Sequence, residues 1–282
     1  MTDSSSLSPE YVAARRVLLD ALFLMHDQID ALVLVGAQAV YLRAPLGDSR
    51  PTYTTDADLA IDPDLLARVP DLGHKLSSAG FVLDEHENPG HWYSPDGIVV
   101  DLMVPAGSLP TSSRRTAPLD GQDRRTARST RGLEVSLYDN SLAEIAALDK
   151  TDLRTISLRV AGPAALVIAK SVKIRERLDA ANPGRVITKD AGDLLRLLRN
   201  SAPTELGARL SDLSRHDRLR DQIADVIAWL RTQFDGERST PMLRLVSQEL
   251  EGIESAVQSE RSLRLLGRQL LSGYDEAEGV AP

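Results

Sequence analysis

The chain has 282 residues, a net charge of −8, 42% hydrophobic residues, 26% charged residues and no cysteine. This composition is typical of a folded protein with one large or two modest hydrophobic cores, and it excludes disulfides and thiolate metal sites. No apolar run approaches the roughly 20 residues of a membrane-spanning helix, the N-terminus lacks a signal-peptide pattern, and the acidic charge argues against a surface that binds nucleic acid throughout. We therefore expect a cytoplasmic protein that does not enter a membrane.

The first half of the chain predicts mixed helices and strands. Ser8-Pro9-Glu10 is typical of a helix start, and helical apolar spacing continues to about His26. Further helices are expected over 37–43 and over 63–79, the second ending at Gly80. Strands are expected over 31–35, 57–61, 81–84, 91–93, 98–104, 133–137 and 156–160, with a turn over 94–97.

The second half predicts mainly helices. A helix is expected from Pro163 to Arg175, then a loop containing Asn182-Pro183-Gly184, and then helices over 189–198, 217–233, 241–256 and 258–271. The sequence therefore predicts an α+β protein. Residues 1–160 would form a domain with a mixed sheet flanked by helices, and residues 161–282 a helical domain.

Two aspartates separated by one residue stand at the start of a predicted strand. Side chains at positions i and i+2 of a strand point to the same face, so Asp56 and Asp58 should project together. Two carboxylates held so close repel each other, and a divalent metal between them would offset that repulsion. Asp101 interrupts another apolar strand and is a candidate third acid. Three carboxylates on adjacent strands can hold two Mg²⁺ ions, with Mn²⁺ as an alternative.

A glycine follows the strand before the acid pair. Gly36-Ala37 lies at a predicted strand-to-helix junction, where backbone N–H groups and the helix N-terminus could bind phosphate oxygens. Each feature also has a structural interpretation. An Asp-x-Asp pair can be solvated at a strand end, a single strand acid can pair with an arginine or lysine, and a glycine can serve a tight turn.

The first long helix of the second half carries a lysine in an apolar stretch. Lys170 either extends to solvent or is held inward by an anion, and Lys173 shares its helix face as a weaker candidate. Asp190 and Asp193 are neighbours on the next helix. Because Asp190 can serve the first helical turn, Asp193 is the better candidate for a site.

These motifs in this order resemble the polymerase-β-type nucleotidyltransferase superfamily. "LVIAKSVKIRERL" followed by "KDAGDLLRLL" narrows the resemblance to the AbiEii/MenT branch, the toxins of AbiE-type toxin–antitoxin systems. The resemblance covers roughly residues 32–198, and Gly36-Ala37 departs from the usual Gly-Gly or Gly-Ser.

The resemblance implies a polymerase-β-like fold whose helical domain completes the active site. It also implies a toxin that transfers a nucleoside monophosphate from an NTP to RNA, in particular to the tRNA 3′ end, with release of pyrophosphate and a block of translation. A cognate antitoxin would be its partner. It assigns metal binding to the aspartates, triphosphate contact to Lys170 and support of the site to Asp193. The candidate catalytic residues are thus Asp56, Asp58, Asp101, Lys170 and Asp193, with Gly36, Ala37 and Lys170 for the nucleotide.

A basic segment follows the third acid. Residues 107–132 contain six arginines against two aspartates, and they predict a mobile loop outside the core. The segment is either a solvated charge run or an arm that contacts an RNA backbone. The candidate RNA contacts are Arg114, Arg115, Arg124 and Arg125. The five histidines show no metal-ligand spacing.

Three other functions stay open. The same fold could use a small acceptor, as aminoglycoside adenylyltransferases do, or a hydroxyl group of a protein. A degenerate, non-catalytic domain could instead act as a binding module. The sequence does not identify the NTP.

Overall fold

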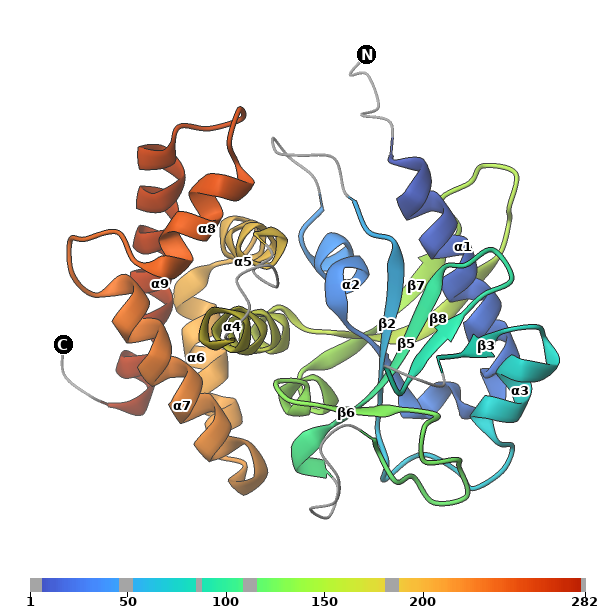
Figure 1. Cartoon of the computed structure of the whole chain (residues 1–282). Coiled ribbons are helices and arrows are strands. Elements are labelled where there is room, and N and C mark those ends of the chain that lie inside the picture. Colours follow the sequence, from blue (N-terminus) through green and yellow to red (C-terminus); the bar gives the residue numbers. More distant parts are fainter. Residues whose placement is uncertain (1–6, 46–52, 85–87, 109–115, 181–187, 280–282) are drawn as a thin grey trace. The chain divides into compact units, whose positions relative to one another are not determined.

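The computed structural model describes residues 7–45, 53–84, 88–108, 116–180 and 188–279 (Figure 1). The chain divides into two compact units, and each is described by itself. The first is drawn from Met1–Tyr41 and Pro51–Ala161, and the second from Leu42–Arg50 and Gly162–Pro282. The first unit is a mixed sheet with helices and the second is helical, so the predicted α+β class is confirmed.

The sheet of the first unit contains eight strands within the described residues. The order β3-β4-β5-β2-β1-β8-β7 forms one path, and β6 pairs with β5 beside it. Strand β2 pairs in parallel with β5 and antiparallel with β1, while β1 pairs in parallel with β8. The strands are β1 (Leu32–Leu34), β2 (Asp56–Ile61), β3 (Val82–Leu83), β4 (His91–Tyr93), β5 (Val99–Pro105), β6 (Arg128–Thr130), β7 (Asn140–Ala146) and β8 (Thr155–Ala161).

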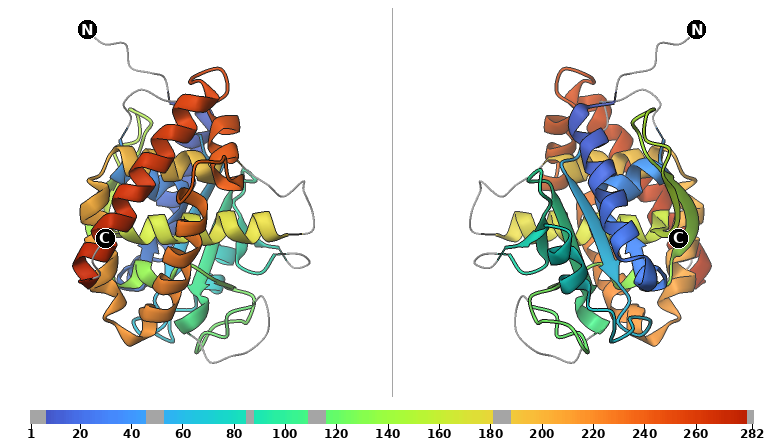
Figure 2. Two further views of the ribbon diagram at one scale, coloured as in Figure 1. Left: turned by 90° about the vertical axis from the view of Figure 1, so that its left-hand side faces the viewer. Right: turned by 90° about the vertical axis from the view of Figure 1, so that its right-hand side faces the viewer.

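Helix α1 (Pro9–Leu24) packs against the sheet. Its start matches the prediction, since Ser8 Oγ accepts a hydrogen bond from the backbone N–H of Tyr11 at 3.2 Å. The helix contacts β2, β5 and β8 and lies against one face of the sheet (Figure 2). The other helical elements of this unit are α2 (Gly36–Arg43), α3 (Leu72–Ser78) and the 3₁₀ turns η1 (His26–Ala31), η2 (Ala106–Ser108) and η3 (Glu134–Leu137).

Two predicted elements of this unit are wrong. The helix expected over 63–79 exists only as α3, because Pro70 lacks a backbone N–H and disfavours a helical residue before it. Asp71 then accepts from the N–H of His74 and starts the helix anew. The strand expected over 133–137 is the 3₁₀ turn η3, and the strand that pairs with β8 is β7, which follows it.

The predicted basic loop also needs correction in its described part. Residues 128–130 form β6, and Thr116 bridges to Arg128. Ala117, Leu119 and Ala127 are buried. The described part of this segment is therefore attached to the first unit by a short strand and by three buried apolar side chains, and it is not a loop throughout.

The second unit consists of helices that approach each other closely. They are α4 (Pro163–Asp179), α5 (Lys189–Arg199), α6 (Pro203–Ser214), α7 (Asp217–Phe234), α8 (Pro241–Glu249) and α9 (Ala256–Glu278). A Cβ added to Gly207 of α6 would lie 2.0 Å from the backbone oxygen of Leu270 in α9, and one added to Gly273 would lie 2.1 Å from that of Thr204. Glycine on both helices therefore lets their backbones touch. The sequence did not predict α6, and α9 is longer than expected.

Candidate functional site

Asp56 and Asp58 occupy the strand position that the sequence predicted. Both belong to β2 and both are half-buried. Thr54 Oγ1 donates a hydrogen bond to Asp56 Oδ1 at 2.6 Å. The residues alternate along β2, so the two side chains share one face of the sheet.

Gly36 lies directly against the carboxylate of Asp58. Its φ of +68° falls in the left-handed region, and an added Cβ would meet Asp58 Oδ2 at 1.8 Å. Gly36 is also the first residue of α2, while the side chain of Ala37 is buried. An aspartate thus stands at a helix N-terminus, where the helix dipole favours negative charge.

The backbone at Asp56 is tied to a buried arginine. Gln38 Nε2 donates to the backbone oxygen of Asp56 at 3.0 Å, and Arg15 Nε donates to Gln38 Oε1 at 2.8 Å. Arg15 also donates to Tyr11 Oη and to the backbone oxygen of Ala146, each at 3.0 Å. This chain of hydrogen bonds connects α1, α2 and the start of β2, and it holds the backbone of Asp56 in place.

Asp101 is the neighbour of Asp58 across the β2–β5 pair. Its carboxylate is buried and accepts hydrogen bonds from Arg128 Nε at 2.9 Å and 3.1 Å, and from Arg128 Nη2. His91 Nε2 lies 3.4 Å from Asp101 Oδ2. Burial would raise the pKa of Asp101, but the hydrogen bonds and charge of Arg128, assisted by His91, hold it below the ordinary value.

Two of the four candidate RNA contacts, Arg124 and Arg125, lie in the described part of the basic segment. Arg124 is exposed, whereas Arg125 is half-buried and its Nη2 donates to the backbone oxygen of Asp84 at 2.7 Å. Arg114 and Arg115 lie outside the described residues. Of the four candidate RNA contacts, Arg124 is therefore the one with an exposed side chain in the described segment.

Lys170 in the second unit is held inward by two carboxylates. Its Nζ donates to Asp190 Oδ1 at 2.8 Å and to Asp193 Oδ2 at 2.6 Å, and all three side chains are at most 5% exposed. Arg177 also donates to Asp190, and Lys173 Nζ lies 3.9 Å from it. Asp190 is therefore as much a part of this cluster as Asp193, although the sequence favoured Asp193.

The charges of this cluster stabilise one another. Burial would lower the pKa of Lys170, but Asp193 and Asp190 raise it well above its ordinary value. Burial would likewise raise the pKa of Asp190, but Lys170, Lys173 and Arg177 hold it well below its ordinary value. The lysine and Asp190 thus stay charged across the whole pH range near neutrality.

The lowered pKa of Asp190 predicts a contribution to acid stability. Because this pKa is lower in the folded than in the unfolded chain, the stabilisation is present above about pH 4 and is lost as the pH falls through the folded value. We expect Asp190→Asn to flatten the fall in unfolding free energy below about pH 4. Urea unfolding at several pH values, followed by far-ultraviolet circular dichroism, measures this slope. An unchanged slope would show that Asp190 keeps an ordinary pKa in the folded protein.

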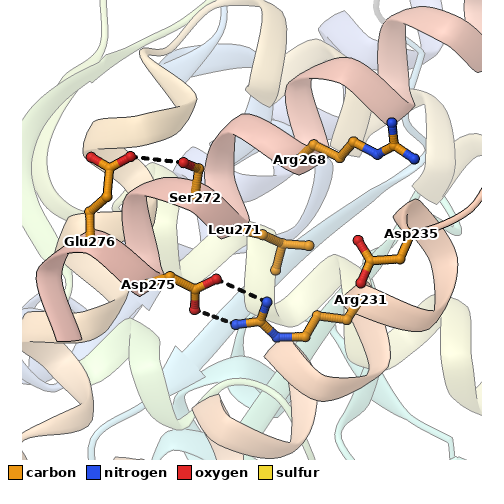
Figure 3. Close-up of a pocket in the computed structure, with 7 residues that line it drawn as sticks. All are labelled: Arg231, Asp235, Arg268, Leu271, Ser272, Asp275 and Glu276. Atoms are coloured by element: carbon orange, nitrogen blue, oxygen red, sulfur yellow. Dashed lines mark hydrogen bonds and ion pairs between the residues drawn. The ribbon is translucent and has the colours of Figure 1, made fainter. Parts of the chain in front are cut away.

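A shallow pocket lies between α7 and α9 of the same unit (Figure 3). Its volume is about 220 Å³. Arg231 pairs with Asp275, with Nη1 and Oδ2 3.0 Å apart, and Arg268 donates to the backbone oxygens of Phe234 and Gly236. These two arginines bind groups of the protein itself, and their contacts connect the end of α7 to α9.

The sequence missed two residues beside the acid pair. Arg128 is one of six arginines in a segment that the sequence predicts to be a loop, and the spacing of the five histidines does not single out His91. Within the described ranges, no group of three or more histidine, aspartate and glutamate side chains is arranged to hold a metal ion. The pairing of β4 with β5 places His91 opposite Asp101, and the sequence does not specify this register.

The comparisons with known proteins do not identify the chain. No family model, no curated protein and no solved structure matches it. Among the described helices, none combines the length and the apolar character that crossing a membrane requires.

Proposed function

We propose that the chain is a Mg²⁺-dependent nucleotidyltransferase of the polymerase-β type, acting as an AbiEii/MenT-like toxin. One observation carries the proposal: two aspartates on one sheet face lie beside a left-handed glycine that begins a helix. That combination places carboxylate oxygens next to backbone N–H groups, which suits a metal and a phosphate together.

The acid pair fits a magnesium ion by its chemistry. Carboxylate oxygens are the ligands that Mg²⁺ prefers, and the ion takes few of them, with phosphates and water filling its shell. Asp56 and Asp58 would hold the ion, and Mn²⁺ could replace it. When bound, it would offset the charge of the triphosphate and of the attacking hydroxyl.

The residues around the pair orient it. Thr54 fixes one oxygen of Asp56 by its hydrogen bond. Because Gly36 has no side chain, the Asp58 carboxylate can lie at the N-terminus of α2. The first N–H groups of α2 would donate to phosphate oxygens. Holding both reactants in fixed positions supplies much of the rate in such reactions.

In the second unit, Lys170 would contact the triphosphate and Asp193 would support it, which are the roles that the family resemblance implies. Lys170 supplies a permanent positive charge, and Asp190 and Asp193 hold its ammonium group in place. A triphosphate would have to share this cation with two carboxylates. Lys173 on the same helix has a side chain that is 50% exposed and offers a second cation.

RNA, in particular the 3′ end of tRNA, is the acceptor that the resemblance favours. The exposed Arg124 is compatible with contact to a phosphate backbone. A small molecule or a protein hydroxyl is the alternative acceptor. Incubation with each α-labelled NTP, Mg²⁺ and total RNA separates them, because label in a tRNA-sized band supports the proposal and label only on a protein or small molecule contradicts it.

Asp58→Ala tests whether the protein is an enzyme of this type. We expect label transfer to fall by about 100-fold or more, since a metal ligand contributes several kcal/mol to the transition state. Toxicity on expression should disappear with the transfer. Asp64→Ala, which removes an exposed carboxylate after the same strand, is the matched control and should retain both. Retained toxicity in a folded Asp58→Ala protein would favour a non-catalytic binding module.

A further inference from the structure

Asp101 lies beside the acid pair but is already bound by a cation. Its side chain is 6% exposed, and both of its oxygens accept hydrogen bonds from Arg128. His91 Nε2 lies 3.4 Å from one of them. A guanidinium group that binds both oxygens in this way matches the carboxylate in charge and in geometry.

The sheet register places Arg128 at this position. Strand β4 covers the first part of β5, and β6 pairs with the part that follows, so Arg128 is the neighbour of Met103. Met103 and Asp101 are two residues apart on β5 and share one face of the sheet. The arginine therefore extends back along β5 to reach the carboxylate.

Backbone contacts hold the arginine there. Gly90 donates to the backbone oxygen of Arg125 at 2.9 Å, and its own oxygen accepts from Leu102 at 2.9 Å. A Cβ on Gly90 would meet the backbone nitrogen of Arg128 at 2.8 Å, so the chain segments touch at this point. Arg128 is thus fixed by the fold of the first unit and does not belong to a loose arm.

This arrangement does not fit a centre in which three aspartates bind two divalent ions. An ion placed against Asp101 would lie next to a permanent positive charge, and displacing that charge would leave Arg128 without its carboxylate. At the acid pair, Thr54 donates a hydrogen bond to Asp56, and the backbone of Gly36 lies against the carboxylate of Asp58.

We propose that Arg128 takes the place of a second metal ion, so that Asp101 positions this arginine and the acid pair alone binds one divalent ion. The inference rests on the proposed function, because it concerns the metal of that reaction. It assigns Arg128 as the fixed cation of the acidic face and reduces the expected number of metal ions from two to one.

Titration with Mn²⁺ alone, with free Mn²⁺ followed by electron paramagnetic resonance, tests this in the full chain. We expect one bound ion, with similar affinity, in the wild type and in Asp101→Asn. In Asp58→Asn the affinity for Mn²⁺ should fall by about tenfold or more. Arg128→Met should bind a second ion, whereas Arg128→Lys, which keeps the charge, should not. The double variant Arg128→Met/Asp101→Asn should return to one ion.

Two bound ions in the wild type and one in Asp101→Asn would overturn the inference while leaving the proposed function in place. If the wild type binds no Mn²⁺, the proposed function is overturned. The inference about Arg128 is then decided by whether Arg128→Met binds Mn²⁺. Binding that appears in this variant and disappears in the double variant supports Arg128 as the internal cation, and no binding in any variant overturns both. If Arg128→Met does not fold, Asp101→Asn decides, since an affinity as low as that of Asp58→Asn contradicts the inference.

Discussion

Lys170→Met is expected to lower the free energy of unfolding of the second unit by about 3–5 kcal/mol. The substitution removes the ammonium group and leaves the buried carboxylates of Asp190 and Asp193 without their shared partner. Arg177 and Lys173 remain near Asp190, but Asp193 has no other ion pair among the described residues. An uncompensated buried charge is the dominant cost of such a change.

Urea unfolding followed by tryptophan fluorescence measures this effect in the correct unit. The chain has two tryptophans, Trp92 in β4 and Trp229 in α7, so Trp92→Phe gives a background that reports on the second unit. Lys173→Met is the matched control, and its half-exposed pair should be worth less than about 1 kcal/mol. Lys170→Met/Asp193→Asn should recover part of the loss. Equal costs for the two lysines would contradict the buried-cluster interpretation.

Gly36→Ala is expected to lower the free energy of unfolding of the first unit by about 3 kcal/mol and to disturb the acid pair. About 1–2 kcal/mol of this arises because alanine disfavours a left-handed backbone. The rest arises because the new methyl group would meet Asp58 Oδ2 at 1.8 Å and must push the carboxylate aside. Transfer activity should therefore fall with stability. Trp92 fluorescence in a Trp229→Phe background measures the first unit.

Gly97→Ala separates the two causes. Gly97 has a φ of +77° and no atom within 4 Å of an added Cβ, so alanine there meets only the backbone cost. We expect its effect to be about 1–2 kcal/mol. In an Asp58→Ala background, the cost of Gly36→Ala should move toward that value, because two of the three crowding atoms are gone. Equal effects at Gly36 and Gly97 in the wild type would mean that Asp58 adjusts freely.

Elements with local signals could be predicted from the sequence. The cap at Ser8, the apolar strand around Asp101 and the helix that contains Lys170 all formed near the expected positions. Strand β7 could not, because it is an edge strand in which one residue, Ile145, is buried, and its existence depends on pairing with β8. Helix α6 depends on the contact between Gly207 and α9, which no local pattern indicates.

The candidate site divides in the same way. The shared face of Asp56 and Asp58 follows from strand periodicity, and Gly36 lies against Asp58 in the structure. The pairing of Asp101 with Arg128 requires the register of β6 on β5, which the sequence does not specify. The share of Asp190 in the lysine cluster likewise depends on how α5 packs against α4.

The position of β1 within the sheet has a consequence for folding kinetics. This strand pairs with β2, which follows it closely, and with β8, where Val33 meets Arg159. During synthesis β2, the next strand along the chain, is available early, but β8 emerges only after all the intervening strands. Parallel pairing over such a sequence separation closes slowly. The acid pair on β2 therefore acquires its complete sheet late, so a ribosome-bound chain that ends before residue 161 should lack a folded acidic face.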